Sequence, residues 1–439
     1  MEPQAINDWR RTDYIGSLGK EQDQKEVTLA GWVQDIRNLG GIAFLVLRDR
    51  TGTMQVTLLK KKLEDMYKPL TELPRESVVM VKGRVQLNDK VHTGIEVMPS
   101  EVKLLSKAAT PLPLGIVDEV NAELDTRLNA RFLDLRKDDV RAVFMLRNSI
   151  LDATRAQLNE EGFIEIQTPK IVGAATEGGT SLFPMEYFDR KAYLNQSPQL
   201  FKQMLMATGF DKVCEIGPAF RAEEHDTVRH LNEFTSIDIE MAFSDEEDVM
   251  GVLERLIKAS VDLIKSSNQK ELETLGIELE DVPLPLPRLT YDECREICKE
   301  KGLDIPFGED LTMEATKLLA EKVQGYYFIT RWPMAAKPFY IQPYEPDPKY
   351  SRGFDLMYKE KEITSGGQRV HDLAFLISRL EEQGLDPEDF TFYLDAFKYG
   401  IPPHAGWGLG LERMAMILSQ SDNIRECVLF PRDRYRLIP

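Results

Sequence analysis

The sequence predicts an α+β protein, with a small β-barrel at the N-terminus and a larger domain in which helices flank an antiparallel sheet. Short apolar strands dominate residues 27–105, a proline-containing connector follows at 106–124, and helical patterns alternate with strand pairs after residue 138. A change of pattern across a connector marks a domain boundary. We therefore expect a barrel over residues 1–105, a connector over 106–137 and the larger domain over 138–439.

Residues 27–105 contain five runs rich in Val, Ile, Leu and Phe, separated by turn signals such as Thr51-Gly52. Five short strands in a segment of this length are typical of a small closed barrel, the OB-fold. Such barrels bind single-stranded nucleic acid by stacking bases on exposed aromatic rings. Phe44 and Gln55 could offer a stacking face and a hydrogen-bond partner for a base edge, although Phe44 fits the barrel core equally well.

The larger domain begins with an amphipathic helix at 138–161, which Gly162 ends. The run FIEIQTPKIV, residues 163–172, follows as a strand that Pro169 closes. Further strands are expected at 192–194, 213–216, 235–241, 326–330 and 353–358, and further helices at 245–267, 311–323 and 370–383. Loops of hairpin length join several of these strands, which predicts a largely antiparallel sheet.

The composition excludes several classes of protein. A net charge of −18 argues against diffuse binding to nucleic acid, although local basic patches remain able to contact phosphates. The sequence has no apolar run of about eighteen residues and no apolar segment near its start, so we expect neither a membrane span nor a secretory signal. Four scattered cysteines favour a reduced, cytoplasmic protein without a disulfide framework or a zinc site.

Residues 220–240 place arginine, histidine and several carboxylates close together, and apolar residues run through the second half of the stretch. Unpaired buried charges are costly, so this density of charge does not suit a plain core. The pattern predicts two strands joined by a charged loop that faces a polyanion. A solvated surface loop is the alternative.

Residues 406–413, GWGLGLER, combine alternating glycines with the start of a helical pattern. Glycines let the backbone approach a ligand closely, and Arg413 would lie in the first turn, where a helix favours anions. The spacing fits neither the dinucleotide fingerprint nor the Walker A motif. A nucleotide bound here would therefore be held in another way.

Two further segments carry candidate ligand groups. Asp355, Glu362 and Ser365 offer the oxygen atoms that magnesium takes while it also binds substrate phosphates, although an acidic pair of this kind can also be simply solvated. Gln199 and Lys202 lie three residues apart, on one face of an expected helix. Because the sequence shows neither a Ser-His-Asp order nor an activated cysteine, covalent catalysis is disfavoured.

Taken in order, the strand ending at Pro169, the segment FRAEEHDTVRH and the segment GLGLER resemble motifs 1, 2 and 3 of the class II aminoacyl-tRNA synthetases. The N-terminal barrel is similar to the anticodon-binding OB-fold of subclass b. TEGGTSLFPM, NQSPQLFKQ, TSGGQR, PPHAGWGLGLER and LFPRDRYRLIP resemble the aspartyl-tRNA synthetases of the archaeal type, over essentially the whole chain. The resemblance implies a homodimer that activates L-aspartate with ATP and Mg²⁺ and transfers it to tRNA(Asp).

The same resemblance implies roles for single residues at the nucleotide. Arg221 and Arg413 would hold the phosphates, Phe234 would stack under adenine, and Glu362 would act with the two arginines in catalysis. The remaining ATP contacts that it implies are Glu223, Arg229, His230, Leu231, Glu362, Gly410, Leu411 and Glu412. The metal ligands that it implies are Asp355, Glu362 and Ser365.

For the amino acid, the resemblance implies that Arg369 reads the aspartate side chain with its planar guanidinium fork. Asp238 would accept the substrate amine, and Glu177 lies on a segment similar to a loop that closes over the amino acid. The other aspartate contacts that it implies are Gln199, Lys202, Arg221 and Ser365.

For the tRNA, the resemblance implies that Phe44 and Gln55 stack on and read the anticodon. Gln34 and His92 occupy positions that track tRNA choice: discriminating relatives carry Trp and Lys there, and non-discriminating relatives carry His and Pro. This chain matches neither pair. The absence of Trp and Lys favours relaxed specificity, in which tRNA(Asn) is also charged.

Three alternatives stay open at this point. Asparaginyl-tRNA synthetases share all three motifs, but Arg369 together with Lys202 favours an anionic substrate side chain. A catalytically inactive RNA-binding paralogue should have lost Arg221, Glu362 or Arg413, and the sequence keeps all of them. An ammonia-using asparagine synthetase on the same catalytic fold would not need the N-terminal barrel.

Overall fold

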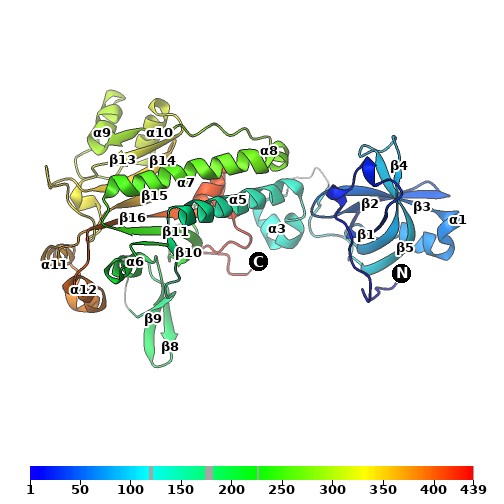
Figure 1. Ribbon diagram of the computed structural model, residues 1–439, viewed down its shortest axis with the longest axis horizontal. Coiled ribbons are helices and arrows are strands. Elements are labelled where there is room, and N and C mark those ends of the chain that lie inside the picture. The colour runs from blue at the N-terminus through cyan, green and yellow to red at the C-terminus, as the bar shows by residue number, and fades with distance from the viewer. Residues whose placement is uncertain (118–121, 174–180, 225–226, 439) are drawn as a thin grey trace. The chain divides into compact units, whose positions relative to one another are not determined.

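The computed structural model describes residues 1–117, 122–173, 181–224 and 227–438. The chain divides into two compact units, Met1–Ala122 and Glu123–Pro439 (Figure 1). The expected three-part division stays a prediction, but part of the expected connector lies in the larger unit, as helices α3 (Leu124–Asn129) and α4 (Arg131–Asp134). The reason is Arg131, which is buried and donates hydrogen bonds to the carbonyls of Val428 and Leu429 near the C-terminus.

The smaller unit is a closed five-stranded barrel with the strand order β1-β2-β3-β5-β4, as expected for an OB-fold. Its strands are β1 (Glu26–Asn38), β2 (Ile42–Arg48), β3 (Thr53–Leu59), β4 (Val78–Leu87) and β5 (Ile95–Ser106). Two short helices between β3 and β4 were not expected, namely α1 (Lys60–Leu63) and α2 (Tyr67–Thr71). These helices form because Leu63, Tyr67 and Leu70 join the barrel core. The side chains of Lys60, Lys61 and Lys62 stay at the surface.

The larger unit is built on an eight-stranded sheet with the order β12-β13-β14-β15-β16-β11-β10-β6. The pairs β12–β13 and β10–β6 at its two edges are parallel, and the other pairs are antiparallel. The strands are β6 (Ile164–Glu165), β10 (Lys212–Phe220), β11 (Glu233–Ala242), β12 (Arg288–Thr290), β13 (Tyr326–Thr330), β14 (Gly353–Tyr358), β15 (Lys361–Gln368) and β16 (His404–Gly410). The largely antiparallel sheet is therefore confirmed.

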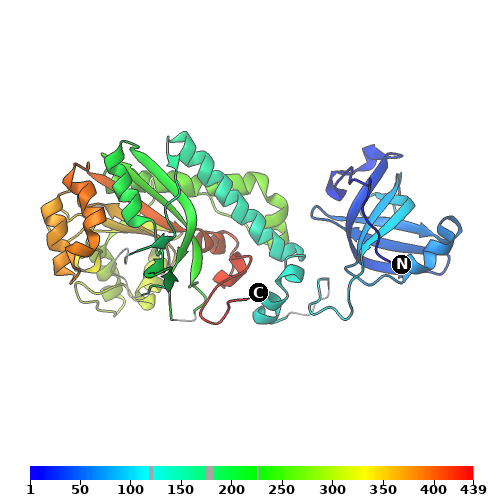
Figure 2. The same ribbon diagram turned by 90° about the horizontal axis from the view of Figure 1, so that it is seen from below.

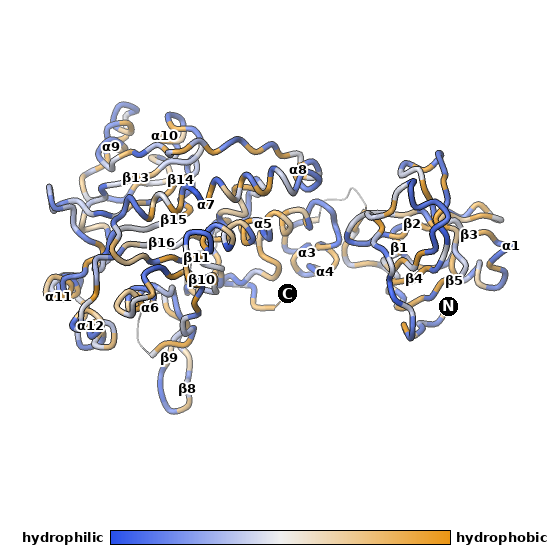
Figure 3. Tube along the Cα trace, in the orientation of Figure 1, coloured by the Kyte–Doolittle hydropathy of each residue, from blue (hydrophilic) through white to orange (hydrophobic). Residues whose placement is uncertain are grey.

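Two long helices, α5 (Asp138–Glu160) and α7 (Glu246–Ser267), run side by side over one face of this sheet (Figures 1 and 2). Both were expected within a residue of their ends. Apolar and polar residues alternate along α7 (Figure 3), and its apolar side joins a core with Trp407 and Ile239 of the sheet. Further helices are α8 (Gln269–Leu275) and α13 (Leu411–Leu418).

Smaller helices pack in two further clusters. Helices α9 (Tyr291–Glu300) and α10 (Met313–Lys322) enclose a core with β13. A third core gathers α6 (Gln199–Leu205), α11 (Leu373–Glu382) and α12 (Thr391–Lys398). All four cysteines are buried free thiols, as expected. Among the described helices, none combines the length and the apolar character that crossing a membrane requires.

The run FIEIQTPKIV leaves its first strand before Pro169, as expected. It forms β6 in the large sheet and β7 (Ile171–Val172) in a separate sheet with β8 (Pro184–Tyr187) and β9 (Arg190–Leu194). The chain leaves the large sheet because buried Glu215 accepts hydrogen bonds from the backbone and hydroxyl of Thr168 and pairs with Lys170. Pro169 between them has no N–H for a strand ladder.

Candidate active site

A cavity of about 350 Å³ opens on the large sheet, where Ser236 and Asp238 of β11 line it. Ile237 and Ile239, which alternate with them, join the core under α7, so the cavity lies on the opposite face of the sheet. Its wall contains most of the expected nucleotide and aspartate residues, which come from segments far apart in the sequence. These are Gln199, Arg221, Glu223, Arg229, His230, Leu231, Phe234, Asp238, Glu362, Ser365, Arg369, Gly410, Glu412 and Arg413. Three others are placed differently: Leu411 lies in the core, Lys202 lies behind Asp238, and Asp355 lines an adjoining cavity of about 230 Å³. Glu177 falls outside the described residues.

The glycines of GWGLG face the carboxylates of the neighbouring strand. In the β11–β16 register, Asp238 lies opposite Gly408 and Glu240 lies opposite Gly406. A Cβ atom at Gly406 would stand 2.2 Å from a Glu240 carboxylate oxygen, and one at Gly408 would stand 3.1 Å from Asp238 Oδ1. The alternating glycines therefore leave room for two acidic side chains to lie over the sheet.

Lys202 neutralises these carboxylates from beneath. Its ammonium lies 2.9 Å from Asp238 Oδ1, 3.0 Å from the Trp407 carbonyl and 3.5 Å from Glu240 Oε2, and its side chain is 2% exposed. A buried lysine needs nearby carboxylates and acceptors to compensate its charge. Asp238, Glu240 and the Trp407 carbonyl provide them for Lys202 without any ligand. Lys202 thus orients Asp238, whose other oxygen accepts a hydrogen bond from Ser236.

Arg369 is held at the inner end of the cavity by Glu240. Its Nε donates to Glu240 Oε1 at 2.9 Å and its Nη2 lies 3.3 Å from Oε2, and both side chains are almost completely buried. Burial alone would raise the pKa of Glu240, but Arg369 and Lys202 outweigh this effect and the pKa lies below its ordinary value. The ion pair therefore fixes a charged guanidinium in the cavity wall.

Gln199 adds an unused donor beside this arginine. Its Oε1 accepts from Arg369 Nη2 at 3.5 Å, and its buried Nε2 has no hydrogen-bond partner among the described residues. Leaving a buried amide donor unpaired costs about 1–3 kcal/mol. An acceptor group bound in the cavity would satisfy this donor, which makes the inner end of the cavity suited to a carboxylate.

His404 lies behind the same ion pair and was not singled out from the sequence. Its Nδ1 lies 2.9 Å from the Pro402 carbonyl and its Nε2 lies 3.5 Å from Gln203 Oε1. Burial lowers the pKa of His404 to about 4, and the charge of Glu240 opposes this effect only in part. The folded protein therefore keeps this ring neutral at pH values where an unfolded histidine is protonated.

This difference predicts a loss of stability in mild acid. The unfolded His404 takes up a proton near its ordinary pKa of 6.5 and the folded one near 4, so the free energy of unfolding falls as the pH drops through this window. The full effect is about 3 kcal/mol. Urea unfolding of the wild type and of His404→Gln at pH 7 and pH 4.5 should show a smaller pH effect in the variant. His92→Gln, at an exposed histidine of the barrel, should keep the wild-type pH effect.

The outer part of the cavity is formed by the ends of β10 and β11. Arg221 lies at the end of β10, and its guanidinium carbon stands 5.2 Å from the centre of the Phe234 ring on β11. Backbone groups of Arg221 exchange hydrogen bonds with Asn232, whose own backbone N–H bonds to Arg432 near the C-terminus. The charged stretch 220–240 is thus two paired strands joined by a loop, as predicted, with Phe234 and Arg221 facing the cavity.

The loop between these strands closes toward β14 and β15. Arg229 lies 3.9 Å from Glu360, in the turn between those strands, and His230 Nδ1 lies 2.6 Å from the Thr227 hydroxyl. Both Arg229 and His230 line the main cavity and the adjoining one. They place a cation and an imidazole above the outer part of the cavity.

A bulge in β15 brings Glu362 and Ser365 to the same face. Met357 pairs with Glu362 and Leu356 with Thr364, so Ile363 is an extra residue between them. Asp355 lies opposite Ser365 in the register. The Glu362 side chain is half exposed, yet loss of hydration and the nearby charge of Asp355 raise the pKa of its carboxyl. Two carboxylates that repel one another in this way favour a shared cation.

Arg413 and Glu412 begin helix α13, at the edge of the cavity. Arg413 donates a hydrogen bond to the Glu362 carbonyl, and its stem packs over Gly410, where a Cβ atom would stand 3.6 Å away. Glu412 instead points into the protein, where it bonds to Arg147 of α5 and to the backbone of Thr235. Arg413 is therefore held beside Glu362 in the cavity wall, whereas Glu412 fixes the helix to the sheet.

In the barrel, Phe44 projects outward. It alternates on β2 with buried Ala43 and Leu45, so the alternative position in the core is wrong. Gln55 also faces outward and donates to Glu96 at 2.8 Å. Gln34 is the extra residue of a bulge in β1, with its Oε1 3.5 Å from Arg48, and His92 is exposed in the turn between β4 and β5.

Several residues of the cavity wall were missed from the sequence. Lys337, Tyr340 and Ile341 come from the long loop between β13 and β14, and Glu240 and His404 support Arg369 from behind. The sequence contains a weak signal for Glu240, because this residue lies two residues after Asp238 in an expected strand and so shares a face with it. The loop residues gave no signal, because only the tertiary structure brings this loop to the sheet.

Comparisons with known proteins agree with this geometry. Residues 123–434 match a family described as "tRNA synthetases class II (D, K and N)", and residues 27–105 match "OB-fold nucleic acid binding domain". An aspartate--tRNA(Asp/Asn) ligase of Methanocaldococcus jannaschii is 52% identical over 98% of this chain and 99% of its own length. An aspartate--tRNA(Asp) ligase of Thermoplasma volcanium is 50% identical, over 97% and 99%.

Among solved structures, asparaginyl-tRNA synthetase from Pyrococcus horikoshii, complexed with asparaginyl-adenylate, matches with a TM-score of 0.93 and 34% identity, over 98% of this chain and all of that one. The resemblance found in the three sequence motifs therefore extends to the complete fold. It covers both the barrel and the domain that holds the cavity. The chain belongs to the class II tRNA synthetases of the D, K and N group.

Proposed function

We propose that the protein is an aspartate–tRNA ligase, which activates L-aspartate with ATP and transfers it to the 3′ end of tRNA. The observation that carries the proposal is the inner end of the cavity, where Arg369 is fixed on Glu240 next to the unpaired amide donor of Gln199. A guanidinium fork and an amide suit a carboxylate side chain. The identity of about half to named aspartate–tRNA ligases supports the same substrate.

The proposed reaction has two steps. The α-carboxylate of aspartate attacks the α-phosphorus of ATP in line, which forms aspartyl-adenylate and expels pyrophosphate. The 3′-hydroxyl of the terminal tRNA ribose then attacks the activated carbonyl and releases AMP. Neither step needs a covalent bond to the protein, so the protein acts by orientation and by charge stabilisation.

Each part of the cavity has a place in this scheme. Asp238, oriented by Lys202 and Ser236, accepts the substrate amine. Arg221 neutralises the α-phosphate and the attacking carboxylate, while Phe234 supports the adenine ring. Arg413, Arg229 and His230 contact the phosphates from the other side. Glu223, Leu231, Gly410 and Glu412 form the remaining wall, and Glu177 is proposed as a further contact of the aspartate.

Mg²⁺ fits the donors that Asp355, Glu362 and Ser365 provide. This ion binds proteins through one or two carboxylates and takes its other ligands from water and phosphates. Among the described residues, no group of three or more His, Cys, Asp or Glu side chains forms a complete metal cage. A site of two carboxylates and a hydroxyl therefore suits an ion that arrives with ATP, and when bound the ion would neutralise phosphate charge.

We propose relaxed tRNA choice, with both tRNA(Asp) and tRNA(Asn) as substrates. The relative in Methanocaldococcus jannaschii is named for both tRNAs and the one in Thermoplasma volcanium for tRNA(Asp) alone. Gln34 and His92 lack the Trp and Lys of discriminating relatives. Charging each purified tRNA with radioactive aspartate is the test. Aspartyl-tRNA(Asn) at a rate comparable to aspartyl-tRNA(Asp) is expected, and its absence would refute relaxed choice.

Phe44→Ala should weaken tRNA charging and spare amino-acid activation. Phe44 faces outward in the barrel unit, and loss of one stacked base costs about 1–3 kcal/mol. We therefore expect KM for tRNA(Asp) to rise roughly 5- to 150-fold. Aspartate-dependent ATP–pyrophosphate exchange should stay at the wild-type rate. An equal loss in both assays would contradict an anticodon role for Phe44.

A homodimer is also part of the proposal. Ile164 and Ile171, on the short strands either side of Pro169, are exposed to 45% and 46%. Exposed apolar residues beside motif 1 are compatible with a covering subunit. Light scattering of the purified protein should give twice the mass of 50.2 kDa, and a monomer at micromolar concentration would contradict this part.

A further inference from the structure

Lys337 lies where the cavity meets the proposed metal carboxylates. Its ammonium is 2.9 Å from Asp355 Oδ2, and the two side chains are 11% and 7% exposed. The ammonium also stands 4.5 Å from the centre of the Trp332 ring, and the aliphatic stem runs over Gly353, where a Cβ atom would stand 3.3 Å from Lys337 Cε. Lys337 is therefore a buried, oriented cation on a carboxylate and not a surface lysine.

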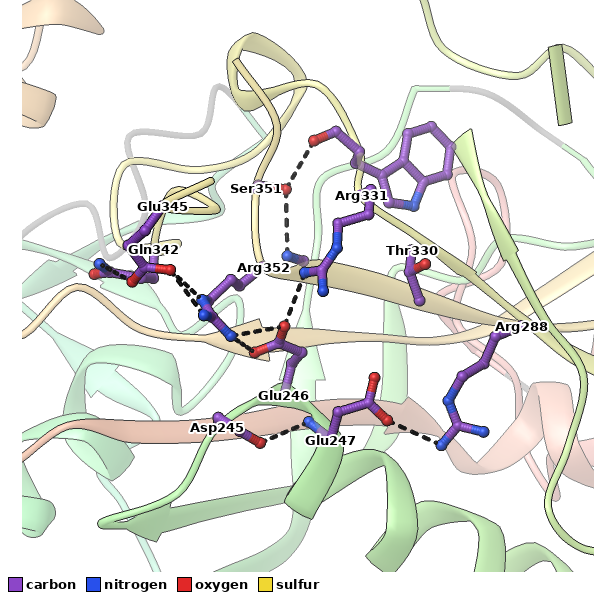
Figure 4. Close-up of polar contacts among 12 residues, drawn as sticks. Asp245, Glu246, Glu247, Arg288, Thr330, Arg331, Gln342, Glu345, Ser351 and Arg352 are labelled. Carbon is purple, nitrogen blue, oxygen red and sulfur yellow. Dashed lines mark hydrogen bonds and ion pairs between the residues drawn. The ribbon is translucent and has the colours of Figure 1, made fainter. Parts of the chain in front are cut away.

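The loop that carries Lys337, residues 331–352, is anchored at both ends to helix α7. Arg331 and Arg352 both donate to the buried carboxylate of Glu246, at 2.9 to 3.0 Å, in the first turn of that helix (Figure 4). The Arg331 guanidinium also stacks on Tyr344 of the loop, 3.6 Å from the ring centre. These contacts hold the loop against the sheet, so the position of Lys337 is fixed by its surroundings.

The charge around Asp355 explains why a cation is needed there. Asp355 is buried and shares a face of the sheet with Glu362. The guanidinium of Arg413 lies near the carboxylate of Glu362, at 3.6 Å. An unpaired buried carboxylate would be costly, and Lys337 supplies the compensating charge. A divalent cation on Asp355 Oδ2 would displace the Lys337 ammonium, and one on Oδ1 would lie within a few ångströms of that ammonium and be repelled by it.

We propose that Lys337 is a positioning residue that competes with a divalent cation for Asp355. In the absence of nucleotide it holds the carboxylate oriented and compensates its charge, and it weakens metal binding before ATP arrives. The phosphates of ATP then supply further ligands and negative charge, so the metal binds Asp355 in place of Lys337. The Lys337 ammonium is released into the cavity that it already lines. This inference rests on the metal site of the proposed function and adds an order of binding to it.

The test is direct binding of Mn²⁺, as a probe for Mg²⁺, to the full-length protein without nucleotide. Lys337→Met keeps the stem and removes the charge. Removing a cation a few ångströms from a metal site should tighten divalent binding by at least about tenfold. Free Mn²⁺ can be counted by electron paramagnetic resonance. Lys337→Arg keeps the charge and should bind Mn²⁺ as weakly as the wild type does.

Lys349→Met is the matched control, because it removes the same charge from the same loop at a lysine paired with Asp347. It should leave Mn²⁺ binding unchanged. If Lys337→Met does not fold, Lys337→Gln serves the same purpose with a polar group against Asp355. Unchanged or weaker Mn²⁺ binding in the neutral variants would overturn the inference, because a merely structural lysine predicts that result.

One further variant separates this inference from the proposed function. Asp355→Asn in the presence of ATP should weaken Mn²⁺ binding if Asp355 is a metal ligand. Wild-type binding in Asp355→Asn would overturn the metal site and, with it, the competition. Weakened binding in Asp355→Asn together with no gain in Lys337→Met would overturn the competition alone.

Discussion

Arg221→Ala is expected to abolish aspartate-dependent ATP–pyrophosphate exchange while the protein stays folded. Arg221 is the cation at the end of β10 that faces the cavity beside Phe234. Charge that develops at the α-phosphorus would lose the arginine proposed to neutralise it, and one such contact is worth about 10²–10³ in rate. The Arg221 contacts with Asn232 use Arg221 backbone atoms only, so the truncation leaves them in place.

The matched control for this experiment is Arg255→Ala. Arg255 lies on α7 and pairs with Glu161 at the surface, away from the cavity wall. The Arg255→Ala variant should catalyse aspartate-dependent ATP–pyrophosphate exchange at the wild-type rate. Circular dichroism and the urea midpoint of both variants should match the wild type. Near-normal exchange in a folded Arg221→Ala protein would remove Arg221 from the proposed ATP site.

Arg369→Leu is expected to have the second large effect, on both stability and aspartate use. It leaves Glu240 buried without its guanidinium partner, which costs about 3–5 kcal/mol of unfolding free energy. It also removes the group proposed to bind the aspartate side chain. Truncating one member of such a pair costs about 2–5 kcal/mol in binding, or roughly 30- to several-thousand-fold in kcat/KM for aspartate.

A double variant separates the two effects. Arg369→Leu combined with Glu240→Gln removes the unpaired charge, so much of the lost stability should return. Activity with aspartate should not return, because the guanidinium is still missing. Urea unfolding and exchange kinetics at varied aspartate concentration measure the two effects independently. Normal kcat/KM for aspartate in the stable double variant would contradict the proposed role of Arg369.

The sequence was sufficient for elements whose apolar pattern is local. The barrel strands, β13, β14 and helices α5 and α7 follow directly from alternating or helical apolar spacing, and the structure places them close to the expected ends. The residues 163–172 have an equally apolar pattern but form two strands in different sheets. Pro169 marked the end of the first strand, but the path after it depends on buried Glu215, which is distant in sequence, so local spacing did not predict the second sheet.

The sequence predicted which residues form the candidate site better than it predicted how those residues are arranged. Glycines at 406 and 408 suggested close approach of a ligand, whereas in the fold they make room for Glu240 and Asp238 on the adjacent strand. This role depends on the β11–β16 register, which a sequence does not state. The same holds for Lys202, which matches a ligand-binding motif but here supports Asp238 from beneath.

The central claim is that the cavity selects aspartate, although a protein named for asparagine shares the fold at a TM-score of 0.93. The most direct measurement is ATP–pyrophosphate exchange by the wild-type protein with L-aspartate and with L-asparagine, without tRNA. We expect exchange with aspartate and a kcat/KM for asparagine lower by at least about 10²-fold, because the neutral amide of asparagine offers the Arg369 guanidinium one uncharged acceptor oxygen, whereas the aspartate carboxylate offers two charged ones. Exchange with asparagine that equals or exceeds that with aspartate would contradict the claim.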